Sequence, residues 1–160
     1  MNSAFARSMA EISLCIVQKI KENEEKQTSK GLLSLLLTLC RNMEDVAVRN
    51  ASCAAQLRAN QLGLGDLRKY HWDDGGRFPG GRKESGLHWE HWKPAVDMRT
   101  EILLLENPNV ERIEAILKSA RVCWVLLEEN DALNKNGHKM RRKDPEICYK
   151  EANIDLYYDW

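Results

Sequence analysis

The chain has 160 residues, of which 43% are hydrophobic, and this is enough to bury the core of a compact domain. Basic and acidic residues number 24 each, so the formal net charge is zero. The molecule as a whole therefore has no global electrostatic attraction to nucleic acid or to a membrane, and any such attraction must come from local patches.

Cysteine spacing and the first residues indicate a reducing compartment. The five cysteines contain no C-x-x-C pair, and we interpret them as buried thiols of a reducing environment. Residues 1–15 include Glu11, whereas a signal peptide needs an unbroken apolar stretch. The most apolar run, residues 31–40, is about half the length that spans a bilayer. We predict a cytoplasmic protein with no membrane contact.

Two amphipathic helices are predicted in residues 1–62. Apolar residues recur at helical spacing in the first helix, which should end in the charged stretch 21–26: Phe5, Met9, Ile12, Ile16 and Ile20. Ser29 is a candidate cap for a second helix, whose apolar positions continue to Leu57 and which should stop at Gly63. We expect an antiparallel helical hairpin that serves as a scaffold, through which the chain could form a homodimer or contact a protein partner.

A glycine-rich region covers residues 63–88. It holds seven of the nine glycines together with Pro79, and it shows no sustained helical or strand period. Long loops inside compact domains are uncommon and often functional. The sequence leaves open whether this one is functional or is a mobile surface loop.

The remaining residues predict a small α+β part. Pro94 suits the start of a helix over residues 96–105, and Asn109 can cap a second helix. Residues 122–127 form a short apolar run of strand type, followed by helical residues 128–133 and a polar loop at 134–143. Asp144 and Pro145 predict another helix, and residues 154–158 a terminal strand. The predicted fold is mostly α with a small α+β C-terminal part: a scaffold of residues 1–62 and a mixed helix/strand unit of residues 63–160, together one compact domain.

Glu90 and His91 are the strongest candidates for chemistry. They are adjacent, and Trp89 and Trp92 flank them. Tryptophans can exclude water and strengthen charge interactions. A histidine is the natural general base near neutral pH, and a carboxylate can hold a divalent ion that activates water. The alternative is that His88 and His91 are ordinary histidines beside tryptophans that simply pack.

The Glu-His-Trp-Lys-Pro string at residues 90–94 resembles the opening of HNH, or ββα-metal, nucleases, and residues 124–138 look like the second half of that motif. The resemblance covers residues 87–139. It implies a metal-dependent endonuclease that hydrolyses phosphodiester bonds in DNA or RNA with Mg²⁺ or Mn²⁺. It also implies residue roles: His91 as general base, Glu90 as metal ligand, Asn130 or Asn134 as the orienting residue and His138 as second metal ligand. In this chain the stretch between His91 and the second strand is long enough for two helices, where the family has a hairpin.

A basic segment follows the second half of the motif. Five permanent cations lie within nine residues, at Lys135, Lys139, Arg141, Arg142 and Lys143. Such a patch can neutralise phosphates of a nucleic acid. The alternative is a solvated basic loop that balances the acidic residues Glu128, Glu129 and Asp131.

Two other functions fit the sequence. Arg82 and His88 have the Arg-x-x-x-x-x-His spacing of HEPN ribonucleases, which resemble this chain in being helical and which work as dimers without metal. The second alternative is a non-enzymatic helical interaction or regulatory protein, in which the tryptophans form the binding surface.

Overall fold

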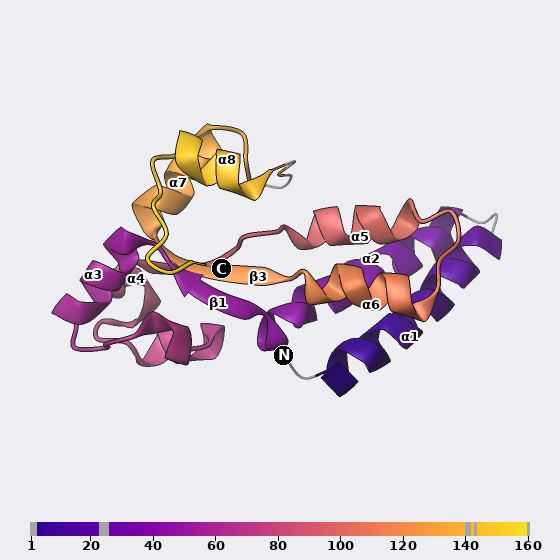
Figure 1. Ribbon diagram of the computed structural model, residues 1–160, viewed down its shortest axis with the longest axis horizontal. Coiled ribbons are helices and arrows are strands. Elements are labelled where there is room, and N and C mark those ends of the chain that lie inside the picture. Colours follow the sequence, from indigo (N-terminus) through magenta and orange to yellow (C-terminus); the bar gives the residue numbers. More distant parts are fainter. Residues whose placement is uncertain (1–2, 23–25, 140–141, 143, 160) are drawn as a thin grey trace. The chain divides into compact units, whose positions relative to one another are not determined.

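The computed structural model describes residues 3–22, 26–139, 142 and 144–159. These residues are mostly helical with one three-stranded mixed sheet, which confirms the predicted fold class (Figure 1). The chain forms two compact units, each built from two separate stretches. Unit 1 comprises Met1–Ala47 and Lys93–Ala120, and unit 2 comprises Val48–Trp92 and Arg121–Trp160. Residues 1–62 therefore contribute to both units.

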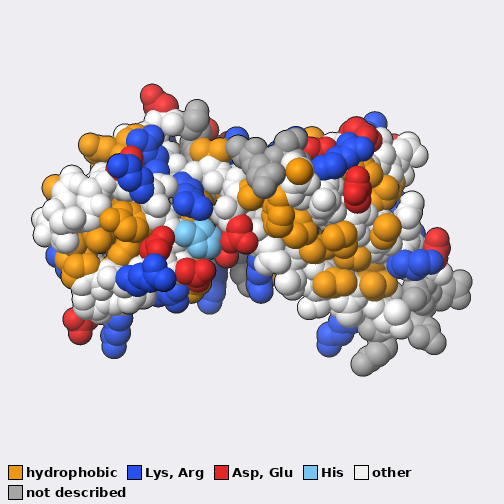
Figure 2. All heavy atoms as spheres, turned by 90° about the horizontal axis from the view of Figure 1, so that it is seen from below, with side chains coloured by type: hydrophobic (Ala, Val, Ile, Leu, Met, Phe, Trp, Pro, Cys, Tyr) orange, Lys and Arg blue, Asp and Glu red, His pale blue; other side chains and the backbone are white. Residues whose placement is uncertain are grey.

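Unit 1 is helical. Its helices are α1 (Ser3–Glu22), α2 (Lys26–Asn42), α5 (Ala95–Leu103) and α6 (Val110–Lys118). Helix α1 packs on α2 and α6, while α2 also packs on α5. Asn109 caps α6, as predicted, because its side chain accepts a hydrogen bond from the Arg112 amide at 2.9 Å. Figure 2 shows apolar side chains gathered on one face of unit 1, and Ile12 and Leu35 are among its exposed apolar residues. No helix in the described residues is long and apolar enough to cross a bilayer.

The prediction of one continuous helix to Leu57 is wrong. Helix α2 ends at Asn42 and is followed by the 3₁₀ helix Met43–Val46, strand β1 (Val48–Ala51) and helix α3 (Cys53–Gln61). Ser52 starts α3 by accepting a hydrogen bond from the Ala55 amide at 3.0 Å. Strand β1 exists because it pairs with a strand some 70 residues later, a long-range contact that overrides the local helical periodicity.

Unit 2 is built around the sheet, with strand order β1-β3-β2. Strand β3 (Arg121–Leu126) lies parallel to β1 and antiparallel to β2 (Leu87–His91). Helix α7 (Leu127–Lys135) follows β3 directly, and α8 (Pro145–Glu151) starts at an Asp144 cap. These elements confirm the predicted strand and both predicted helices. The predicted terminal strand is reduced to a single bridge between Ser52 and Leu156.

The glycine-rich region is more ordered than a surface loop. It contains the 3₁₀ helices Leu67–Lys69 and Trp72–Arg77 and the short helix α4 (Gly81–Ser85). Leu67 is fully buried, and the Phe78 ring packs 5.4 Å from that of Trp124. Glycines at positions 80 and 86 flank α4 in left-handed backbone conformation, which side chains disfavour. The region therefore covers one face of the sheet.

Alternation along the strands gives the sheet two distinct faces. Trp89 pairs with Trp124 across the strands, and their rings lie 5.0 Å apart on the face that Phe78 covers. Glu90 pairs with Cys123 on the opposite face. Cys123 belongs there to the apolar cluster of α7 and α8, which includes Leu133, Tyr149 and Ala152. Neighbouring residues of β2 thus have different surroundings.

All five cysteines are free thiols, and three of them are buried as predicted: Cys40, Cys123 and Cys148. Burial raises the pKa of the Cys40 thiol to about 12 and that of Cys123 well above its ordinary value. Cys15 and Cys53 are exposed, so the prediction of buried thiols is wrong for these two.

Candidate functional site

One connected polar group in unit 2 joins His88, Glu90 and Arg142. His88 and Glu90 are two residues apart in β2, so their side chains leave the same face of the sheet. His88 Nε2 lies 3.4 Å from Glu90 Oε2, and Arg142 Nη2 donates a hydrogen bond to Glu90 Oε1. The Glu90 carboxylate therefore bridges an imidazole and a guanidinium.

Arg142 holds this group together. Only 1% of its side chain is exposed. Besides its bond to Glu90, it donates to three carbonyl oxygens, those of His91, Trp92 and His138. One of these carbonyls is the last of β2, one directly follows β2 and one lies just beyond α7, so the guanidinium of Arg142 joins these two parts of unit 2.

Glu90 is ionised in this setting. Burial of its side chain raises its pKa. The hydrogen bond with His88 and the charge of Arg142 lower the pKa by more, so the pKa of Glu90 lies below its ordinary value. The His88 side chain is 32% exposed, whereas that of Glu90 is 14% exposed. A solvent-facing imidazole is thus backed by a fixed carboxylate. This arrangement suits a general base, because the carboxylate orients the ring and stabilises it once it takes a proton.

The structure separates the two residues that sequence reasoning paired. His91 pairs with Val122 across the strands, on the Trp89 face, while Glu90 points to the face of α7 and α8. The Nε2 atom of His91 has almost no solvent-accessible surface. Adjacent strand residues point to opposite faces, so Glu90 and His91 do not form one site.

The other residues implied by the resemblance are on or near α7. Asn130, Leu133 and Asn134 share a helix face, and Leu133 is fully buried against the Cys123 side of the sheet. Both asparagines are therefore on the same side of the sheet as His88 and Glu90. His138 Nε2 lies 2.9 Å from Glu151 Oε2, so its ring is engaged at the surface.

The predicted metal ligands Glu90 and His138 each contact other side chains in the structure. Both carboxylate oxygens of Glu90 already have partners, Arg142 and His88, and His138 is paired with Glu151. Within the described residues, no three His, Cys, Asp or Glu side chains are grouped so as to hold a metal ion.

The predicted basic patch is altered by the fold. Lys135 and Lys139 are exposed, as predicted for such a patch. Arg142, which was expected to contact phosphates, is instead buried, because its guanidinium bonds to Glu90 and three carbonyls. Arg141 and Lys143 lie outside the described residues.

Arg82 and His88, the pair suggested by the ribonuclease spacing, lie on different elements. Arg82 belongs to α4, and its guanidinium stacks 3.5 Å from the centre of the Trp72 ring. Its side chain adjoins Gly75, which lies next to Trp124, so it is on the sheet face opposite His88. The spacing does not bring these two side chains into one group.

Sequence reasoning missed the role of Arg142. It lies in a run of cations that looks like an exposed patch, and it meets Glu90 from 52 positions away in the chain. A buried glutamate needs a cationic partner, but nothing in the local sequence identifies which of several cations supplies it.

Comparison of the chain with protein-family models, with curated proteins and with solved structures found no match.

Proposed function

We propose that unit 2 cleaves phosphodiester bonds in nucleic acid, with His88 as the general base. The observation that carries the proposal is the partly exposed His88 imidazole held against an ionised, largely buried Glu90 that Arg142 fixes in place. In this respect the proposal departs from the roles that the resemblance implied, because His88 replaces His91.

The order of the elements supports the same class of reaction. Strands β2 and β3 pair antiparallel although residues 92–120 separate them, and β3 leads directly into α7. A strand, an antiparallel strand and a helix in this order are the arrangement that the ββα resemblance implies. Where that family has a hairpin, this chain has residues 93–120, which belong to unit 1, and β2 and β3 are nevertheless paired.

The side chains can carry a balanced reaction. The neutral His88 imidazole takes a proton from a water molecule or from a ribose 2′-hydroxyl, and the resulting oxygen nucleophile attacks phosphorus. The bond from phosphorus to the leaving oxygen then breaks, that oxygen takes a proton from solvent water, and the His88 imidazolium returns its own proton to solvent. Glu90 stabilises the imidazolium formed in the first step, while the exposed Lys135 and Lys139 supply charge for the phosphates.

A cleavage assay with matched histidine variants tests the proposal. End-labelled single-stranded RNA, single-stranded DNA and duplex DNA are incubated with the protein in Mg²⁺, in Mn²⁺ and in chelator. His88→Ala is expected to slow cleavage by about 100-fold or more, the typical loss of a general base. His71→Ala is the matched control, because it removes another imidazole of unit 2, one that packs against Trp89 on the opposite face of the sheet.

Glu90→Gln separates positioning from folding. It keeps the shape of the side chain but removes the charge behind His88, so it should reduce the rate and shift the pH dependence of cleavage while His71→Ala changes neither. Thermal unfolding of each variant checks that the fold is intact. Loss of cleavage in His91→Ala with normal cleavage in His88→Ala would overturn the assignment, and absence of cleavage of every substrate under all three conditions would overturn the proposed function.

A further inference from the structure

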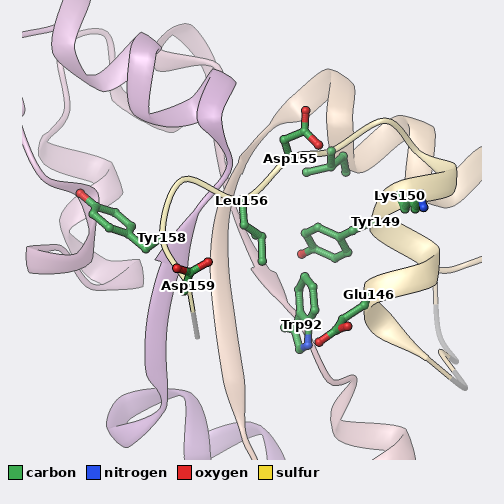
Figure 3. A pocket seen from close by; sticks show the side chains of 9 residues that line it. Trp92, Glu146, Tyr149, Lys150, Asp155, Leu156, Tyr158 and Asp159 are labelled. Carbon is green, nitrogen blue, oxygen red and sulfur yellow. The ribbon is translucent and has the colours of Figure 1, made fainter.

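An open groove in unit 2 lies apart from His88. Its volume is about 560 Å³, and its walls are α8 and the C-terminal segment 154–159, with Trp92 between them. Figure 3 shows Trp92, Tyr149 and Leu156 pointing toward one another, with the carboxylates distributed around them. The size is within the range of pockets that hold ligands much larger than a single ion.

The walls of the groove are held by hydrogen bonds and packing, so the groove is formed in advance of binding. The C-terminal segment is bound to the edge of the sheet through the amide of Tyr157 and the carbonyl of Ala51 at 2.9 Å. The Asn50 amide also donates to the Tyr158 carbonyl at 2.8 Å. On the other side, the Trp92 and Tyr149 rings lie 4.3 Å apart. A preformed groove lowers the entropic cost of binding.

The charges around the groove favour a positively charged ligand. Among the described residues, three exposed carboxylates line it, those of Glu146, Asp155 and Asp159, together with the ammonium of Lys150. The described residues of the lining therefore carry a formal charge of minus two, in a chain whose net charge is zero. Carboxylates beside aromatic rings favour a guanidinium or ammonium group whose aliphatic stem packs on the apolar floor.

We propose that this groove binds a basic segment of a partner polypeptide, with an Arg or Lys side chain among the three carboxylates and a neighbouring apolar side chain against Leu156 and Trp92. A polypeptide fits better than a lone cation because the groove combines an apolar floor with an acidic rim. The site is distinct from the proposed catalytic group, since neither His88 nor Glu90 lines it.

Fluorescence anisotropy with two matched peptides tests the proposal. The first probe is a fluorescein-labelled peptide of alternating Leu and Arg, and the second replaces each Arg with citrulline, which has nearly the same shape but no charge. The Arg peptide is expected to bind at least tenfold more tightly than the citrulline peptide, with an affinity that falls as salt rises.

Isosteric variants of the groove locate the binding. The double variant Asp155→Asn/Asp159→Asn should weaken binding of the Arg peptide about fivefold to tenfold, because it removes two of three carboxylates without changing their shape. Asp131→Asn is the matched control, an exposed acid of α7 that does not line the groove, and it should leave the affinity unchanged.

Four outcomes would overturn the proposal: equal binding of the two peptides, an equal loss in the double variant and the control, no anisotropy change at millimolar protein, or spermidine competing as tightly as the peptide itself. The last outcome would assign the groove to a small polyamine. Each of these results leaves the cleavage assay of His88→Ala unaffected, so failure of this proposal is distinguishable from failure of the proposed function.

Discussion

Replacement of Arg142 by methionine should strongly destabilise unit 2. Methionine keeps much of the length and packing of the side chain but removes its charge and all of its donors. The Glu90 carboxylate would then stay buried without its cationic partner, and the carbonyls of His91, Trp92 and His138 would lose a shared donor.

The size of the effect follows from burial. Removal of one partner from a buried ion pair costs about 3–5 kcal/mol, and here the exposed fractions are 1% for Arg142 and 14% for Glu90. This is a large part of the roughly 5–15 kcal/mol that stabilises an entire domain. Arg142→Lys keeps the charge but loses the planar fork, so we expect an intermediate loss of about 1–3 kcal/mol. The double variant Arg142→Met/Glu90→Gln should lose less than the sum of the single variants.

Urea unfolding at several pH values provides the assay. In the native chain the pKa of Glu90 is lowered, so Glu90 contributes stability above its unfolded pKa of about 4.3, and this contribution is lost as the pH falls through the folded value. Without Arg142, the effect of burial remains and raises the folded pKa, so protonation favours the folded variant. The difference in free energy of unfolding between native chain and Arg142→Met should therefore shrink from pH 7 to pH 4. A difference below about 1 kcal/mol, or one that grows toward low pH, would refute this account of the ion pair.

Three further predictions concern unit 1, the glycine-rich region and the thiols. Asn109→Ala should cost about 1 kcal/mol in urea unfolding, because α6 loses its cap, and an unchanged midpoint would contradict the cap. Gly80→Ala should destabilise more than Gly81→Ala, since both have positive φ but only the first places a methyl group against Glu84; equal losses would contradict this contact. A thiol reagent at pH 8 should modify two cysteines of the folded protein quickly and three slowly, with all five fast in urea: Cys15 and Cys53 against Cys40, Cys123 and Cys148.

Local patterns predicted the elements that depend on neighbouring residues. The cap at Asn109 and the Asp144–Pro145 start of α8 are local hydrogen-bonding and backbone preferences, and both are present in the structure. The apolar run that became β3 is buried on both faces, which is why it is continuous in the sequence. These features required no knowledge of distant contacts.

Elements that depend on distant partners were missed. Residues 48–51 continue the helical spacing of α2, yet they form β1 because β3 offers a row of backbone groups to pair with. The glycine-rich region lacks any period because its order comes from short turns packed on aromatic residues, with Phe78 against Trp124. The sequence near residues 48–51 does not contain β3, and the sequence near Phe78 does not contain Trp124.

The candidate site shows the same limit at the level of single side chains. Adjacent positions in the sequence suggested that Glu90 and His91 act together, but adjacency in a strand places two side chains on opposite faces. Residues two positions apart in a strand lie on the same face, so recognition of residues 87–91 as a strand would have paired Glu90 with His88 instead. Recognition of the strand was the missing step, because its partner β3 begins 30 residues later in the chain.

The contacts of Glu90, which lies behind the His88 imidazole, determine which chemistry the site can support. A carboxylate that faced solvent could exchange its partner for a metal ion, whereas Glu90 has one oxygen on a fully buried guanidinium and the other on His88. Displacement of either partner would leave the largely buried negative charge of Glu90 without compensation. Arg142 supplies that compensation and also joins β2 to the segment beyond α7. The same contacts that stabilise unit 2 thus keep Glu90 ionised and His88 oriented. The proposed catalysis by His88 and the stability of unit 2 should consequently fail together in Arg142→Met, while in His88→Ala only the proposed catalysis should fail.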